Sequence, residues 1–220
     1  PVTDAENRLV GIITVDDVMD VVEEEATEDI YKMSAITPSQ EAYFETGVLK
    51  TARARIPWLI LLMISATITA IIITAYEDAL SAVVVLAASI PMLMDTGGNA
   101  GSQASTTIIR AITLGEVQFR DLPRVIFKEM RVSFLCGVFL AVVNFGRLVL
   151  FSHYTMPVAF VVSSTLFCTV MFAQMIGGVL PMVADKLGLD PALMAAPLIT
   201  TIVDALTLVI YFNIAMALLF

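Results

Sequence analysis

The sequence predicts an all-α, polytopic membrane protein with five transmembrane helices, preceded by a short cytosolic α/β segment. Of its 220 residues, 58% are hydrophobic, and the mean hydropathy is +0.88, values typical of a membrane protein. Five apolar segments each reach the roughly 20 residues that a spanning helix requires. Lys and Arg residues gather in alternate loops, as expected when successive loops lie on opposite sides of a membrane.

Residues 1–36 read as the C-terminal part of a cytosolic domain. A turn at Asp4–Asn7 precedes a short strand at Leu9–Ile13. Thr14 then makes a good N-cap, with Asp17 three residues on, for an acidic helix that runs to about Tyr31. Because thirty-six residues are too few to bury a core alone, we expect the rest of this domain to precede them in a longer protein.

Residues 37–55 are predicted to form a connecting helix. Thr37 supplies a cap, Pro38 takes the first position and Gln40 closes a capping box, so the helix is expected from Pro38 to about Ala54. Its end is basic and lies directly before the first apolar segment, with Lys50, Arg53 and Arg55.

Residues 56–220 form the predicted five-helix transmembrane domain. The apolar segments are Pro57–Ala75, Ala82–Ile109, Val132–Phe151, Pro157–Val183 and Ala192–Phe220. Basic residues precede the first segment and follow the second and fourth, whereas the other two loops have none. The positive-inside rule therefore predicts a cytoplasmic N-terminus, a C-terminus outside, and a multi-pass protein of the plasma (inner) membrane.

Two acids, Asp95 and Asp204, fall deep within predicted spans. Each follows a proline, Pro91 or Pro197, that leaves the carbonyl four residues earlier without its helical donor. Carboxylates and free carbonyls are oxygen ligands, the set that a hard cation prefers, and no His or Cys accompanies them. An intramembrane carboxylate needs a partner, so Asp204 is the stronger functional candidate.

Small and polar residues surround these acids. Gly97, Gly101 and Ser105 recur every four residues, as do Gly98 and Ser102, which lets another helix approach closely. This stripe is more simply explained by helix packing than by a ligand set. The remaining polar side chains either hydrogen-bond across helices or orient bound water; they are Asn99, Gln103, Thr200 and Thr201.

The first 36 residues hold ten acids and two bases, so they carry −8 of the net charge of −9. The helix dipole explains Asp16 and Asp17, and solvated acidic helices are common. However, Asp17, Asp20, Glu24 and Glu28 lie on one face, where like charges repel unless they are neutralised. Either a divalent cation or the basic end of the 38–54 helix would neutralise them.

Three stretches resemble the MgtE family of magnesium channels and transporters. Pro91 to Gln103, ending in Thr-Gly-Gly-Asn-Ala-Gly-Ser-Gln, resembles the family signature. Asp190-Pro191-Ala192, followed by Pro197 to Asp204, resembles its last span. Gly11 to Val18 and Glu25 to Ile30 resemble the end of its second CBS domain and the link to its connecting helix.

The resemblance implies a homodimer with the ion path at the subunit interface, lined by the second and fifth spans. Asp204 matches the acid that holds hydrated Mg²⁺ in the pore, and Asp95 is a possible second pore acid. The helix at 38–54 matches the family's plug helix. Implied pore-lining residues are Gly97, Gly98, Asn99, Pro197, Thr200 and Thr201. Implied residues of a regulatory Mg²⁺ sensor are Asp17, Asp20, Glu25, Glu28 and Asp29.

The function implied is passage of Mg²⁺ into the cytoplasm down its electrochemical gradient, gated by cytosolic Mg²⁺. Alternatives are transport coupled to Na⁺ or H⁺, or broader selectivity that includes Mn²⁺ and Co²⁺. Mg²⁺ and membrane lipid are the expected partners, with no nucleic acid. An enzyme is not expected: Asp95-Thr96-Gly97 is the tripeptide of aspartic proteases, but Asp204 differs from Asp95 in inferred height by about 8 Å at a rise of ~1.5 Å per residue.

Overall fold

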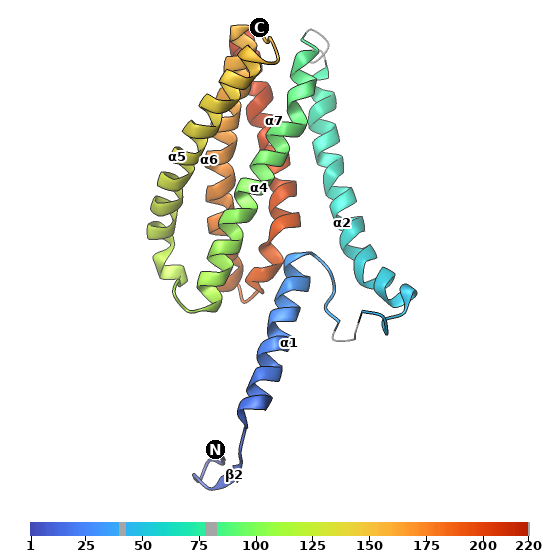
Figure 1. The fold of residues 1–220 in the computed structure, drawn as a ribbon, viewed down its shortest axis with the longest axis vertical. Coiled ribbons are helices and arrows are strands. Elements are labelled where there is room, and N and C mark those ends of the chain that lie inside the picture. Colours follow the sequence, from blue (N-terminus) through green and yellow to red (C-terminus); the bar gives the residue numbers. More distant parts are fainter. Residues whose placement is uncertain (40–42, 78–82, 220) are drawn as a thin grey trace.

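The computed structural model describes residues 1–39, 43–77 and 83–219, and helices dominate this part of the chain (Figure 1). The α-helices are α1 (Val15–Met33), α2 (Val48–Ala75), α4 (Val85–Thr113), α5 (Leu122–Leu150), α6 (Met156–Lys186) and α7 (Ala196–Leu219). The shorter elements are strands β1 (Val2–Thr3) and β2 (Leu9–Gly11) and the 3-10 helices η1 (Phe119–Asp121) and η2 (Pro191–Met194).

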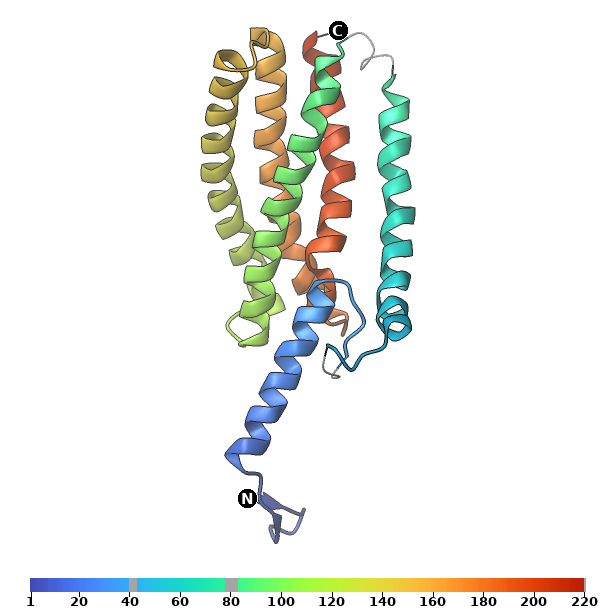
Figure 2. The same cartoon turned by 45° about the vertical axis from the view of Figure 1, so that its right-hand side comes forward.

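Helices α4, α5, α6 and α7 run alongside one another in one bundle, and α2 flanks it on the side of α7 (Figures 1 and 2). Helix α6 packs against α4, α5 and α7, while the main contacts of α5 are with α6 alone. The core is mainly apolar, with a minority of buried Ser, Thr, Asn, Gln and Glu side chains, and Tyr211 and Phe212 of α7 are completely buried in it. The Tyr211 hydroxyl donates to the Leu86 carbonyl at 3.0 Å, which ties α7 to the start of α4.

Within the described residues, four helical segments are long and apolar enough to cross a membrane: Val48–Ala75, Phe119–Leu150, Met156–Lys186 and Pro191–Leu219. Helix α4, the predicted second span, has 29 residues and lies in the same bundle, but its polar signature lowers its hydropathy. All five predicted spans are therefore helical, and the crossing of the membrane by α4 stays a prediction.

The N-terminal segment follows its prediction closely. Strands β1 and β2 pair antiparallel, and the Asp4 side chain accepts the amides of Glu6 and Arg8 in the turn between them. Thr14 caps α1 in a capping box with Asp17, so the acidic helix starts where the sequence indicates and ends two residues later than expected, at Met33. Helix α1 projects away from the bundle (Figure 2).

The predicted connecting helix at 38–54 is wrong in its extent. Residues 37–39 are not helical, 43–46 form a turn and bend, and Gln40 lies outside the described residues. A single helix, α2, begins after Gly47 and continues through Pro57 to Ala75, so it joins the basic residues to the first span. The Thr37 amide donates to the Ala54 carbonyl, so this amide is satisfied by α2 and not within a helix of its own.

An ion pair joins the end of α1 to the start of η2. Lys32 Nζ lies 2.6 Å from Asp190 Oδ2 and also contacts Glu28 one turn earlier. Asp190 Oδ1 accepts the Ala192 amide, so this carboxylate also caps η2. Burial alone would raise the pKa of Asp190, but the hydrogen bonds from Lys32 and Ala192 and the Lys32 charge outweigh it and lower that pKa. The pair is therefore fully charged at neutral pH.

Glycines let α4 lie against its neighbours. A Cβ at Gly177 of α6 would overlap the Gly101 carbonyl oxygen of α4, so the two backbones touch at this level. On α4 itself, a Cβ at Gly97 would lie 2.5 Å from Thr169 Cγ2, and one at Gly98 would lie 2.8 Å from Thr200 Cγ2. The position of α4 between α6 and α7 therefore requires glycine at these sites.

We expect Gly177→Ala to destabilise the bundle by about 1–3 kcal/mol, because the added methyl group meets fixed backbone. Gly146→Ala on α5 is the matched control, since a Cβ there has no other atom within 4 Å. Thermal unfolding of the purified protein, followed by size-exclusion chromatography, compares the two. Equal melting temperatures would contradict the close approach of α4 and α6.

We expect Lys32→Gln to release α1 from η2. A hydrogen bond to a charged group contributes about 1.5–3 kcal/mol, so the undocked population should rise about tenfold or more. Spin labels at the exposed positions Val22 and Leu187, with Cys136 and Cys168 changed to Ser, report the α1–α6 distance distribution.

Glu28→Gln is the control for this experiment, because it leaves the Lys32–Asp190 contact in place. Lowering the pH should also increase the undocked population, as Lys32→Gln does, because it protonates Asp190. Since the Asp190 pKa is lowered by folding, its contribution is complete above the ordinary Asp pKa and is lost as the pH falls through the lowered value. If neither Lys32→Gln nor low pH broadens the spin-label distance distribution, the Lys32–Asp190 pair does not hold α1 against η2.

Candidate functional site

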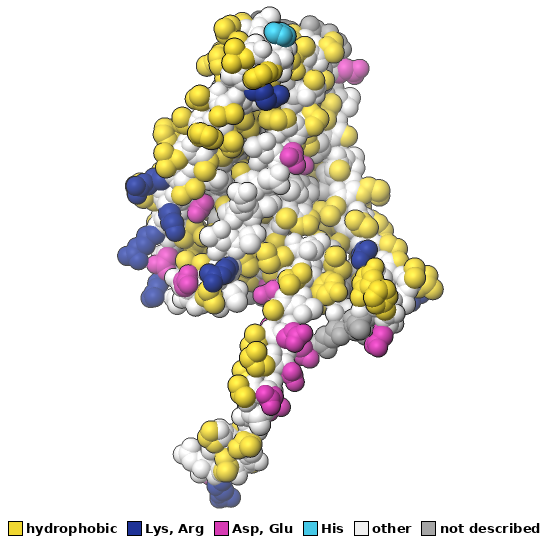
Figure 3. Space-filling model, viewed as in Figure 1, with side chains coloured by type: hydrophobic (Ala, Val, Ile, Leu, Met, Phe, Trp, Pro, Cys, Tyr) yellow, Lys and Arg dark blue, Asp and Glu magenta, His cyan; other side chains and the backbone are white. Residues whose placement is uncertain are grey.

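Helix α4 has one buried face and one exposed polar face. Gly97, Gly98, Gly101 and Ser105 are buried against α6 and α7. The opposite face is exposed and repeats every three or four residues, which is the helical period; it comprises Asp95, Asn99, Gln103, Thr106 and Arg110. We call these five residues the α4 polar face, and Figure 3 shows a largely non-hydrophobic surface over this helix.

This polar face contrasts with the largely apolar outer surfaces of other helices. Helices α2 and α5 expose large hydrophobic side chains along most of their length. A carboxylate and a row of amides and hydroxyls would be costly in contact with lipid. The α4 polar face therefore requires water, an ion or another protein surface against it.

Asp95 and Asp204 come from different helices but lie near each other. Asp95 is exposed on α4, Asp204 is half-buried on α7, and the two charges are close enough to repel each other. No group of three His, Cys, Asp or Glu side chains capable of holding a metal occurs among the described residues. A single chain thus offers two neighbouring carboxylates, which suits a cation that keeps several of its waters.

The fifth predicted span is interrupted, as its proline suggested. Helix η2 ends at Met194, Ala195 is extended, and α7 begins at Ala196, so Pro197 occupies the first turn of a new helix. Ser105 of α4 donates to the Met194 carbonyl at 2.7 Å. Near Pro197, therefore, the Met194 carbonyl accepts a hydrogen bond from a side chain of another helix.

Four of the predicted pore-lining residues make close contacts within the chain. The Thr200 and Thr201 hydroxyls both donate at 3.0 Å to the Pro197 carbonyl within α7. Gly97 and Gly98 are buried where α4 packs on α6 and α7. That these four residues line an ion path stays a prediction. Asn99, by contrast, lies on the exposed face.

The five acids proposed for the sensor divide into two groups. Asp17 and Asp20 are exposed toward the distal end of α1, and the hydrogen bonds with Thr14 lower the pKa of Asp17. At the other end, burial raises the pKa of Asp29, and the charges of Asp190, Glu25 and Glu28 raise it further. Glu25, Glu28 and Asp29 therefore lie within electrostatic reach of one another, and Asp29 within reach of Asp190.

Sequence reasoning missed Glu129, a carboxylate on α5 that is only 8% exposed. The third span was predicted to begin at Val132, which left Glu129 in a loop, but α5 begins at Leu122. Pro123 was the available signal, because proline is favoured in the first turn of a helix. The Lys32–Asp190 pair was also missed, since nothing in the local sequence relates residues so far apart.

The family model described as "MgtE: Divalent cation transporter" matches residues 90–214. The "Magnesium transporter MgtE" of Thermus thermophilus is 42% identical over 220 residues, covering 100% of this chain and 48% of the relative. Its namesake from Bacillus subtilis is 41% identical over 224 residues, covering 99% and 48%. That of Enterococcus faecalis is 34% identical over 215 residues, covering 98% and 47%. The chain thus spans about half the length of these curated relatives.

The matched residues run from α4 to α7, and they include the α4 polar face, the buried glycines, Glu129 and Asp204. They make up more than half of the chain. By this match the chain belongs to the MgtE family of divalent cation transporters, which are not enzymes.

Proposed function

We propose that this chain transports Mg²⁺ across the membrane into the cytoplasm, down its electrochemical gradient. The observation that carries the proposal is the α4 polar face beside Asp204 in an otherwise apolar bundle. A polar path of this kind, bounded by apolar helices, is what a hydrated ion needs to cross hydrocarbon.

The chemistry of the path favours a hard divalent cation. It offers carboxylate, amide and hydroxyl oxygens, from Asp95, Asp204, Asn99 and Gln103 among others, and these suit Mg²⁺. Three relatives are named magnesium transporters, which supports Mg²⁺ as the cargo. Mg²⁺ is thus the substrate, and a second role for it as regulator is part of the same proposal.

A second copy of the chain completes the path. Because the α4 polar face is exposed in one chain, two copies that place these faces together would bury them from lipid and enclose water between them. In such a homodimer the two Asp204 carboxylates would approach the same hydrated ion from opposite sides.

The orientation and the gate follow from the charged ends of the bundle. Basic residues cluster at the end that carries the α4–α5 loop and the start of α2, and this end is cytoplasmic by the positive-inside rule (Figure 3). Helix α1 docks at that end through Lys32 and Asp190, so α1, in place of residues 38–54, is the connecting helix of the proposal. Cytosolic Mg²⁺ on its acidic side chains holds the path closed.

We expect Asp204→Asn in the full-length protein to reduce Mg²⁺ uptake by about tenfold or more, since an ion site that gives up ~1.4 kcal/mol loses a factor of ten. Uptake into proteoliposomes that contain a Mg²⁺-sensitive dye measures the effect. Asp185→Asn, an exposed carboxylate at the end of α6, is the control and keeps wild-type uptake.

Wild-type flux in Asp204→Asn would remove the pore assignment. The same vesicles distinguish the alternative modes of transport. Uptake that requires a Na⁺ or H⁺ gradient would mean coupled transport, and equal uptake of Mn²⁺ or Co²⁺ would mean broader selectivity.

For the sensor, we expect joint neutralisation of Asp20, Glu25 and Glu28 in the full-length protein to leave transport active at high internal Mg²⁺. The reason is that a bound cation stabilises the closed state by neutralising the mutual repulsion of these carboxylates, and the variant no longer has that repulsion. Patch-clamp recording with internal Mg²⁺ as the variable tests this, and Glu6→Gln in the distal turn is the control. Inhibition that persists unchanged in the triple variant would contradict the sensor.

A further inference from the structure

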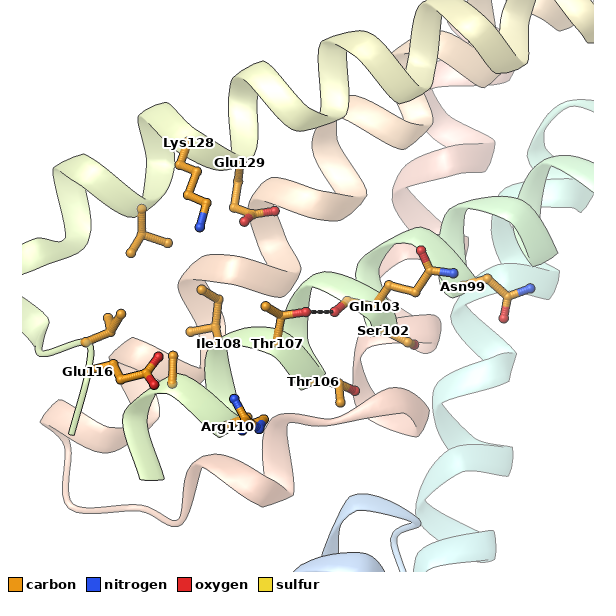
Figure 4. Close-up of a pocket in the computed structure, with 13 residues that line it drawn as sticks. Asn99, Ser102, Gln103, Thr106, Thr107, Ile108, Arg110, Glu116, Lys128 and Glu129 are labelled. Carbon is orange, nitrogen blue, oxygen red and sulfur yellow. Dashed lines mark hydrogen bonds between the residues drawn. The ribbon is translucent and has the colours of Figure 1, made fainter. Parts of the chain in front are cut away.

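A groove with a volume of about 790 Å³ runs between α4 and the first half of α5 (Figure 4). We call it the α4–α5 groove. Its α4 wall is mainly polar, with Ser102, Gln103 and Thr107 beside the apolar Ile108 and Ala111, and its α5 wall consists of Val125, Lys128 and Glu129. Its α4 wall is continuous with the α4 polar face, because Asn99 and Gln103 line both.

The fold makes room for the Glu129 side chain at this wall. Glu129 and Val125 of α5 lie over Gly178 of α6, where a Cβ would stand 3.1 Å from Glu129 Cγ. Any larger residue at Gly178 would displace the glutamate. Figure 4 shows the Glu129 side chain on the groove side of α5.

The Glu129 carboxylate has no hydrogen bond or ion pair to any described residue, although the residue is only 8% exposed. The one charge close enough to act on it within this part of the chain is its neighbour Lys128, which makes no ion pair with it. The Glu129 carboxylate lines the groove, so water or a ligand in the groove can meet it. A carboxylate so enclosed gains from a partner there, because loss of solvation without compensation is costly.

A hydrated divalent cation fits this position. Six waters occupy about 180 Å³ at ~30 Å³ each, so the groove has room for an ion with its first hydration shell. The opposite wall supplies the Gln103 amide and the Ser102 and Thr107 hydroxyls, whose own hydrogens go to the Gly98 and Gln103 carbonyls and leave oxygen lone pairs free. Mg²⁺ keeps several of its waters in such sites.

Other occupants fit less well. A lipid tail would meet amides and hydroxyls along the α4 wall, and a phosphate beside Arg110 and Lys128 would also face the Glu129 charge. Arg110 and Lys128 weaken the attraction for a cation without abolishing it, since Glu116 and Glu129 balance them. Weak binding suits a transported ion, because the ion must leave the site again during conduction.

We propose that the α4–α5 groove is a second cation site, in which Glu129 holds a hydrated divalent ion between Asp204 and the α4–α5 loop. This inference rests on the proposed function, because it assumes that the α4 polar face carries such an ion. The groove site differs from the Asp204 site because its carboxylate lies on α5 and not on α7, and because its ligands all come from one chain.

Mn²⁺ serves as the probe, because its anomalous X-ray scattering identifies it at each position. Crystals of the full-length Asp204→Asn protein grown with Mn²⁺ should show a peak in the groove beside Glu129 and Gln103. The peak should vanish in Asp204→Asn/Glu129→Gln and persist in Asp204→Asn/Asp185→Asn, whose changed residue is an exposed carboxylate outside the groove. A groove without Mn²⁺ in Asp204→Asn, or a peak unaffected by Glu129→Gln, would overturn the proposal.

Transport keeps this test separate from the proposed function. Glu129→Gln alone should lower Mg²⁺ uptake several-fold while the Mn²⁺ peak at Asp204 remains. Where Glu129→Gln impairs folding, Gln103→Leu changes an exposed residue of the opposite wall and should weaken the same peak. Loss of uptake in Asp204→Asn with no peak in the groove would refute the second site and leave the transporter; wild-type uptake in Asp204→Asn would refute the pore assignment whatever the groove holds.

Discussion

The contact of the α4 backbone with α6 and α7 is the constraint on which the rest of the structure depends. Gly101 and Gly177 bring two main chains together, and Gly97 and Gly98 admit Thr169 and Thr200 on the adjoining side. Because this fixes the rotation of α4 about its own axis, it also decides which side chains face outward. The amides, hydroxyls and carboxylate of the α4 polar face are exposed as a consequence of how the glycines pack.

That arrangement separates two roles that the sequence mixes in a single motif. Within Asp95 to Gln103, the glycines pack against other helices, and Asp95, Asn99 and Gln103 are exposed. Under the proposed function, a substitution at a buried glycine would act on transport through the position of α4, whereas one at Asn99 or Asp95 would act on the proposed path directly. The groove beside Glu129 also follows from helix packing, because α5 packs on α6 and stands apart from α4.

Local and periodic features were predictable, and features made by tertiary packing were not. The Thr14 capping box and the apolar spans follow from nearby residues, so the positions of α1, α6 and α7 agree with expectation to within a few residues. The burial of Gly97 depends on Thr169 and Val203, far away in sequence, which no spacing rule reveals. The prediction of a helix at 38–54 was wrong because Thr37 and Pro38 do not begin a helix. The Thr37 amide donates to the Ala54 carbonyl, and the helix begins only after Gly47.

The double use of Asp190 has a mechanical consequence. One oxygen of its carboxylate accepts a hydrogen bond from the Lys32 ammonium and the other accepts the Ala192 amide of η2, so the end of α1 is tied to the short segment that leads into α7. Along the chain, α2 is the next helix after α1, yet the ion pair ties α1 to the segment that precedes α7. A displacement of α1 would therefore be passed directly to the segment that leads into the helix that holds Asp204.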